Sequence, residues 1–330
     1  MKRREFIVVL GGIASLPLIA FARSPNKMPL LGWLSPGVPN DPLGLKVRAA
    51  FDKEIRDLGW VEGQSLRIER RWARGDPDRA HELAKELVEL GPDLILAATS
   101  LCVAALVPLT RTIPIVFAGV SFPTAQGYIA NMARPEGNLT GFTNLTEVST
   151  IGKLLELLKE IVPKISRVAF MINPETTQGV ESIFQSAESA AASLGVEPIH
   201  MPVRSTGEIE SSIAAFARTP NTGMIALPDN FMFIHRELII GIMARHRLPT
   251  VYAFGFWARD GGLIGYGNDV IEPYRQAAGY VDRILRGASV GELPVQQPTK
   301  FELVINLKTA RALSLEIPPN LLARADEVIE

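Results

Sequence analysis

Several polar side chains stand directly after short apolar runs of the sequence, where a strand would end and a helix would begin. In open parallel sheets, ligands bind outside the carboxyl ends of the strands, and helix N-termini point to the same edge. Hydroxyls and free N–H groups there suit a carboxylate, whereas a lone acid such as Asp229 suits an ammonium group. The residues that we predict to contact a ligand are Ser35, Thr99, Ser100, Ser121, Phe122, Asn173, Thr176, Asp229, Asn230 and Phe254.

Helix capping is the alternative explanation for each polar residue of this set, because Ser, Thr, Asn and Asp are good caps and every helix needs one. The set as a whole favours a ligand site, since these strand edges would face one cleft. Aromatic residues near the same edges are suited to walling a pocket for an apolar group, with core packing as the alternative. These aromatic residues are Trp33, Phe122, Phe231, Tyr252, Phe254 and Tyr266.

Sequence signatures of catalysis are missing from the chain. It has no GxxxxGK[ST] phosphate loop, no GxGxxG turn, no GxSxG elbow and no HExxH motif. The four histidines show no metal-ligand spacing. Asp229 and Glu175 are weak candidates for a titratable pair. We therefore expect a protein that is not an enzyme and that holds neither a metal nor a cofactor.

Apolar runs alternate with amphipathic stretches from Leu30 onward, which is typical of parallel sheets covered by helices on both faces. Helix signals between the runs are clear. Asp76 and Pro77 suit the first positions of a helix that Gly91 ends, and Ser205 with Glu208 forms a capping box. The predicted class is α/β, with strands in the runs 30–35, 93–100, 113–120, 167–173, 223–229, 249–254 and 262–267.

The length of the chain exceeds one comfortable hydrophobic core, so we expect two Rossmann-like lobes with parallel sheets. Three interlobe crossings are predicted, near residues 138–150, at 265–268 and in the Pro-rich stretch 292–305. Such crossings form a hinge that closes the lobes on a ligand. We assign residues 27–142 plus 268–297 to the first lobe and residues 143–267 plus 298–330 to the second.

The first 22 residues have the pattern of a signal peptide. Three cationic residues, 2–4, precede an apolar run at 7–20, and Ala20-Phe21-Ala22 fits a cleavage site. That run is shorter than a membrane-spanning helix. The arginine pair also fits a twin-arginine signal, with an ordinary secretory signal as the alternative. Both routes predict a periplasmic protein.

The charge and the cysteine content exclude a nucleic-acid-binding protein and a protein with an internal disulfide. Cleavage after residue 22 would move the formal net charge from −1 to −3, which is not the basic footprint of a nucleic-acid-binding protein. The single cysteine, Cys102, excludes an internal disulfide. It stands in an apolar run, so we expect a buried side chain rather than a nucleophile.

Longer segments resemble one bacterial family. They are KRREFI, WVEGQSLRIERRWARGDPDRAHELAKELV, TIPIVFAGVSFP, ARPEGNLTGFTNL and the stretch from LPDNFMFIHRELIIGIMARH to the end of the chain. Together they resemble ABC transporter substrate-binding proteins, of the type I periplasmic-binding-protein-like group related to tryptophan- and tyrosine-binding lipoproteins. The resemblance extends over the whole chain.

This resemblance implies two α/β lobes, a ligand between them and an inner-membrane ABC permease as partner. We expect the protein to be a monomer. The family's strand-edge contacts fall on Thr99, Ser100, Ser121, Asn173 and Asp229. One loop departs from the family pattern: YAFGFWARDGGL has Gly255 and Phe256 where relatives often carry an arginine and a glutamate, and Trp257 follows. If this loop lines the cleft, the departure favours a more apolar or differently oriented ligand.

The leading hypothesis is a periplasmic solute-binding protein of an ABC importer. Its expected ligand is an amino acid or similar zwitterion with an apolar or aromatic side chain. A ligand-sensing protein that serves a signalling receptor is the first alternative. An enzyme built on the same α/β lobes is the second.

Overall fold

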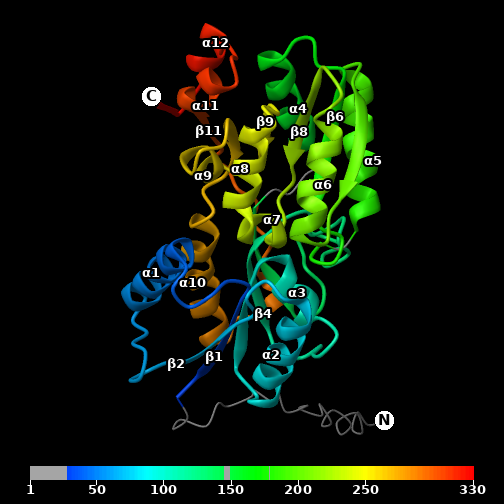
Figure 1. Cartoon of the computed structure of the whole chain (residues 1–330). Helices are drawn as coiled ribbons and strands as arrows, with labels where there is room; N and C mark the ends of the chain where they lie inside the picture. Colours follow the sequence, from blue (N-terminus) through cyan, green and yellow to red (C-terminus); the bar gives the residue numbers. More distant parts are fainter. Residues whose placement is uncertain (1–27, 145–148, 178) are drawn as a thin grey trace, which may run out of the picture.

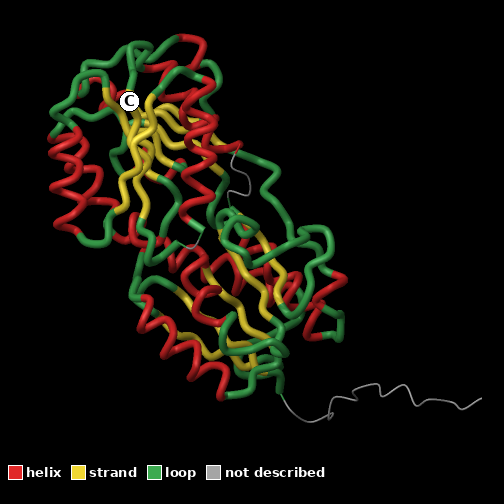
Figure 2. The backbone as a smooth tube through the Cα atoms, turned by 90° about the vertical axis from the view of Figure 1, so that its right-hand side faces the viewer, coloured by secondary structure: helices red, strands yellow, loops and turns green. Residues whose placement is uncertain are grey.

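The computed structural model describes residues 28–144, 149–177 and 179–330, so the predicted signal peptide lies outside the described residues. The strands form two separate sheets, and helices cover both of them (Figure 1). In the view turned by 90°, the strands of each sheet form a group of their own, and helices flank each group (Figure 2). The predicted α/β class with two lobes is confirmed.

Lobe I is the part of the chain built on the five-stranded parallel sheet, whose strand order is β2-β1-β3-β4-β5. Its strands are β1 (Leu30–Ser35), β2 (Arg67–Trp72), β3 (Leu94–Ala98), β4 (Ile115–Val120) and β5 (Leu139–Thr143). One hydrophobic cluster lies under α1 and α10, and a second lies under α2 and α3 on the other face. The helices of lobe I are α1 (Pro42–Asp57), α2 (Pro77–Glu89), α3 (Thr99–Leu106), α10 (Glu272–Leu285) and the short 3₁₀ helix η1 (Val290–Glu292).

Lobe II is built on the seven-stranded sheet, with strand order β12-β11-β10-β9-β8-β6-β7. All of its neighbouring strands are parallel except β10 and β11. The strands are β6 (Arg167–Ile172), β7 (Glu197–Pro202), β8 (Thr222–Ala226), β9 (Thr250–Tyr252), β10 (Ile264–Gly267), β11 (Glu302–Asn306) and β12 (Glu327–Ile329). The helices are α4 (Ser149–Ile161), α5 (Val180–Ser193), α6 (Thr206–Phe216), α7 (Asn230–Ile234), α8 (Arg236–Arg245), α9 (Gly255–Arg259), α11 (Leu307–Ala312) and α12 (Pro319–Leu322).

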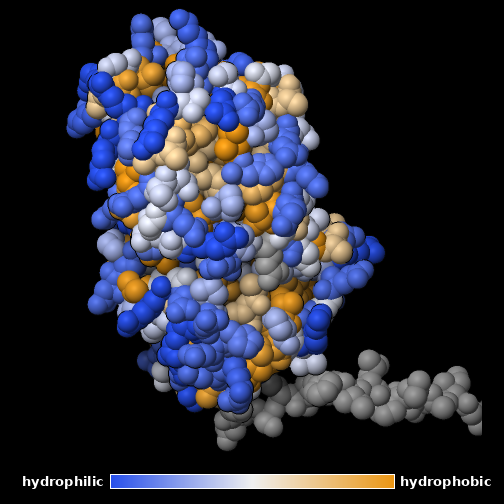
Figure 3. Space-filling model, turned by 45° about the vertical axis from the view of Figure 1, so that its right-hand side comes forward, coloured by the Kyte–Doolittle hydropathy of each residue, from blue (hydrophilic) through white to orange (hydrophobic). Residues whose placement is uncertain are grey.

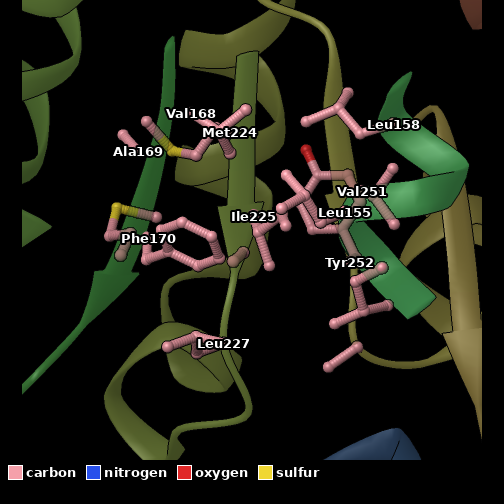
Figure 4. Packing of buried hydrophobic residues seen from close by; sticks show 14 of the residues in the cluster. Leu155, Leu158, Val168, Ala169, Phe170, Met224, Ile225, Leu227, Val251 and Tyr252 are labelled. Carbon is pink, nitrogen blue, oxygen red and sulfur yellow. The ribbon is translucent and has the colours of Figure 1, made fainter. Parts of the chain in front are cut away.

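The core of lobe II forms where α4 lies on the middle strands of the sheet. Leu155 and Leu158 of α4 face Val251 and Tyr252 of β9, and the side chains of β6 and β8 continue the layer (Figure 4). Every residue of β8 is buried, as expected for a parallel strand covered on both faces.

The chain passes between the lobes three times: after β5, after β10 and before β11. The third passage returns the chain antiparallel to β10, and this reversal explains the one antiparallel pair. Side chains join the first two passages, because the Asn268 amide donates to Asn144 Oδ1 at 3.2 Å. The third passage joins the first, because the N–H and the hydroxyl of Thr143 donate to the Gln296 carbonyl at 3.0 and 3.1 Å. The three passages therefore lie together, as a hinge requires.

Two helix starts show how the local sequence sets the elements. The Asp76 carboxylate accepts from the N–H groups of Asp78 and Arg79, and Pro77 occupies the first turn of α2 as predicted. Ser205 accepts from the Glu208 N–H at 3.2 Å at the start of α6. The Glu208 carboxylate accepts from the Arg204 N–H rather than from that of Ser205, so only half of the predicted capping box forms.

The strands that sequence patterns did not indicate are chiefly edge strands. β2, β7 and β12 lie at sheet edges, where half-exposed positions take charged residues and proline. Such strands lack the continuous apolar run that marks a central parallel strand. β5 occupies the first part of the polar stretch 138–150, so the first crossing begins after Thr143.

Cys102 is fully buried in α3, and this burial raises the pKa of its thiol. Because the thiolate is the reactive species, we expect no reaction with a disulfide thiol reagent while the protein is folded. Full reaction should follow unfolding in guanidinium chloride. The absorbance of the thiolate released from the reagent measures the extent of reaction in the folded and in the unfolded protein. Rapid labelling of the folded protein would contradict a purely packing role.

Within the described ranges, no helix combines the length and apolar character needed to cross a membrane. On the face of the molecule in Figure 3, hydrophilic and hydrophobic residues are interspersed. Neither lobe presents an unbroken apolar surface on that face.

Candidate ligand-binding cleft

A cavity lies between the two lobes, at the carboxyl ends of strands from both sheets. The space open to the centres of water-sized molecules is about 150 Å³. A single water needs about 10–15 Å³ of such space, so the cavity has room for several water molecules. An amino acid or another small metabolite is therefore of the right size.

Eight of the ten residues predicted to contact a ligand line this cavity. They come from both lobes because carboxyl ends of parallel strands meet at one edge of each sheet, and the two edges face each other. The eight are Ser35, Thr99, Ser100, Ser121, Thr176, Asp229, Asn230 and Phe254.

Phe122 and Asn173 lie outside the lining. Phe122 follows β4 of lobe I, yet its fully buried ring belongs to the hydrophobic cluster of lobe II. The Asn173 side chain is buried and accepts from the Glu175 N–H at 2.7 Å, which is a local turn contact. Neither side chain is therefore placed to touch an occupant of the cavity in this structure.

Asp229 is the acid that lobe II contributes to the cavity lining, and it also caps α7. Its Oδ1 accepts from the Met232 N–H at 3.0 Å, and its Oδ2 accepts from the hydroxyls of Thr176 at 2.5 Å and Thr177 at 2.7 Å. Burial raises the pKa of the Asp229 carboxyl, and these hydrogen bonds oppose that shift. The capping and ligand-binding explanations thus apply to the same residue, because Asp229 caps α7 and also belongs to the cavity lining.

The start of α3 forms the polar wall of lobe I. Thr99 has a φ of 66°, which is an uncommon conformation for a β-branched residue, and its buried hydroxyl has no hydrogen-bond partner. Ser100 Oγ accepts from the Gln126 amide at 2.8 Å, so its own proton is available to another acceptor. Strain of this kind concentrates at ligand-binding positions.

Aromatic rings from lobe II form the apolar wall. Phe254 and Phe256 are stacked, and Phe233 meets Phe256 edge-on with ring centroids 5.5 Å apart. Trp257 also lines the cavity and stacks on Tyr252 behind it. The loop that departs from the family pattern therefore does line the cleft.

Four of the six aromatic residues predicted near these edges are not in the lining: Phe122, Phe231, Tyr252 and Tyr266. Sequence reasoning missed Trp72, Phe233 and Tyr274, which do line the cavity. It also missed the charged residues Asp41, Arg48 and Arg70. The signal available for Arg70 was weak, because its segment RIERRW has only two apolar residues, Ile68 and Trp72.

The lobes touch beside the cavity at two glycines. A Cβ on Gly75 of lobe I would lie 2.1 Å from Ile234 Cδ1 of lobe II. A Cβ on Gly179 of lobe II would lie 2.2 Å from the Ala125 carbonyl oxygen of lobe I. Both glycines also have positive φ angles. The backbone conformation therefore favours glycine at these positions, in addition to the lack of space for a Cβ.

Among the described residues, no group of three or more His, Cys, Asp and Glu side chains is placed to hold a metal ion. The cavity instead combines hydroxyls, two acids, two arginines and aromatic rings. That combination suits reversible binding of a small organic molecule.

Comparison with solved structures shows that other proteins share this fold. A family model described as ABC transporter substrate binding protein matches residues 40–329. The chain therefore belongs to the family of ABC transporter substrate-binding proteins. The resemblance inferred from sequence segments is confirmed.

Three relatives illustrate the similarity. A tyrosine-binding protein of Clostridioides difficile is 24% identical over 274 residues, which cover 82% of this chain and 77% of that protein. A conserved domain protein of Vibrio cholerae has a structure with a TM-score of 0.83 and 27% identity, covering 92% of this chain and 100% of that one. An ABC domain of Streptococcus pneumoniae in complex with L-Trp has a TM-score of 0.81 and 20% identity, covering 91% and 100%.

Proposed function

We propose that this protein is the periplasmic solute-binding component of an ABC importer. Its ligand is an amino acid or a similar zwitterion with an apolar or aromatic side chain. The observation that carries the proposal is the interlobe cavity, in which Asp229 and the hydroxyl-rich start of α3 lie with a wall of aromatic rings. The ligands of two relatives, tyrosine and L-Trp, support the same class.

The ligand carboxylate binds at the start of α3, where Thr99 and Ser100 offer hydroxyls beside free helix N–H groups. Its ammonium group binds the Asp229 carboxylate, which Thr176 and Thr177 hold in position. Its side chain packs against the rings of the 254–257 loop. Ser35, Ser121 and Asn230 complete the polar contacts.

Binding closes the lobes about the three crossings, because a ligand that bridges both lobes has high affinity only for the closed form. The proposed boundaries are residues 27–142 plus 268–297 for lobe I and 143–267 plus 298–330 for lobe II. The signal peptide at residues 1–22 directs a monomeric protein to the periplasm, by the secretory or the twin-arginine route. An inner-membrane ABC permease receives the ligand.

Native mass spectrometry of the protein purified without refolding tests this function. We expect one small-molecule adduct per chain that dissociates intact at higher collision energy and has the mass of an amino acid or a similar zwitterion. A thermal-shift screen of amino acids should then show stabilisation by the same compound. Conversion of that compound to a product would contradict the proposal, as would a lack of stabilisation by every amino acid.

A further inference from the structure

Unpaired buried polar atoms are concentrated around the cavity. Among the described residues, five buried side-chain nitrogen or oxygen atoms lack a hydrogen-bond partner, and four of them belong to cavity-lining residues. Since nearly all buried polar groups in proteins are paired, each exception needs an explanation. Thr99 and Asn230 have a place in the proposed function. The other two, Trp33 Nε1 and Arg70 Nε, lie together on the β1–β2 side of lobe I.

Trp33 and Arg70 occupy paired positions of neighbouring strands. Trp33 is 4% exposed, and its ring is held edge-on to Phe51 with centroids 4.9 Å apart. The Arg70 guanidinium lies 5.5 Å from the centre of the indole. Both side chains are therefore fixed, and the N–H group that each leaves unpaired is a donor without acceptor capacity.

The charge of Arg70 is already balanced. Its Nη1 donates to Glu62 at 2.7 Å, and its Nη2 donates to Asp52 at 2.9 Å. Arg48, which also lines the cavity, acts electrostatically on Asp52. Two cations and two carboxylates thus stand side by side. An additional carboxylate would meet Asp52 and Glu62, whereas an uncharged oxygen meets two donors and no net charge.

We propose that Trp33 and Arg70 form a subsite for an uncharged hydrogen-bond acceptor on the side chain of the ligand, such as a phenol hydroxyl. This inference rests on the proposed function and narrows it, since a purely hydrocarbon side chain would leave both donors unpaired. A site built around a hydroxyl disfavours the analogue that lacks it for this reason.

Titration calorimetry with L-tyrosine, L-phenylalanine and 4-methyl-L-phenylalanine tests the subsite. We expect L-tyrosine to bind about tenfold or more tightly than either analogue. Trp33→Phe removes the indole N–H and should reduce that ratio to within about twofold. The matched control is Trp60→Phe, because the Trp60 N–H donates to Asp282 on lobe I, outside the cavity lining. This control should leave the ratio unchanged.

Equal affinities of the wild-type protein for all three compounds would overturn the subsite while leaving the proposed function intact. A tyrosine preference that survives in a folded Trp33→Phe variant would also overturn it, with the melting temperature reporting folding. If none of the three compounds binds, then the aromatic amino acid class itself fails, and the subsite fails with it.

Discussion

Asp229→Asn should weaken the binding of an ammonium-bearing ligand by about 10- to 100-fold. A hydrogen bond to a charged group contributes about 1.5–3 kcal/mol, and about 1.4 kcal/mol corresponds to a factor of ten in Kd. Asparagine can still accept from the Met232 N–H, so α7 keeps its cap and the change removes mainly the charge. Titration calorimetry with the ligand recovered by mass spectrometry measures the loss.

The matched control is Asp76→Asn, because Asp76 caps α2 in the same way outside the cavity lining. This variant should bind within about twofold of the wild-type protein. Similar losses in both variants would assign the effect to helix capping. An unchanged Kd in Asp229→Asn would remove Asp229 from the ligand contacts.

The pH dependence of binding should identify the same carboxyl. Burial raises the pKa of Asp229, and an ammonium group binds its ionised form, so affinity should fall as the pH drops through that raised pKa. In the ligand-free protein, the pH dependence of folding stability has the opposite sign. The contribution of Asp229 to stability is complete below the pKa of Asp229 in the unfolded state and is lost as the pH rises through its pKa in the folded state. Both trends should be absent from Asp229→Asn.

Phe122→Ala should favour the open form of the protein, although Phe122 does not line the cavity. The loop that carries Phe122 begins and ends in lobe I, since Val120 and Ile129 belong to a lobe I cluster, but the Phe122 ring packs in lobe II. Deleting a buried phenylalanine side chain costs about 3–5 kcal/mol. If the Phe122 ring packs in lobe II only when the lobes are closed, its deletion destabilises the closed form by this free energy.

Small-angle X-ray scattering of the ligand-free protein should therefore show a larger radius of gyration for Phe122→Ala. Ligand affinity should fall at least about tenfold, because the apparent Kd rises as the binding-competent fraction falls. Phe216→Ala is the control: its ring is buried in the same cluster but on α6. It should lower the melting temperature and leave Kd unchanged. A Phe122 variant that behaves like this control would make the contact a permanent part of the core.

Strand direction made most of the candidate site predictable. An apolar run followed by a polar residue and a helix start marks the carboxyl end of a parallel strand, and all such ends in one sheet lie at the same edge. Thr99 after β3 and Asp229 after β8 were identified in this way, though 130 residues apart in the chain, and both line the cavity. The cap of α2 at Asp76 was equally local, because it involves only the next three residues.

Other features were decided only by the tertiary structure. Nothing near Arg70 in the sequence indicates that β2 pairs with β1, which places its guanidinium beside the Trp33 indole. Nothing near Phe122 indicates that its backbone turns to a φ of 50° and sends the ring into the other lobe. Local patterns record which face of an element is apolar and where the element ends. They do not record which distant element packs there, because that choice depends on how two separately formed cores fit together.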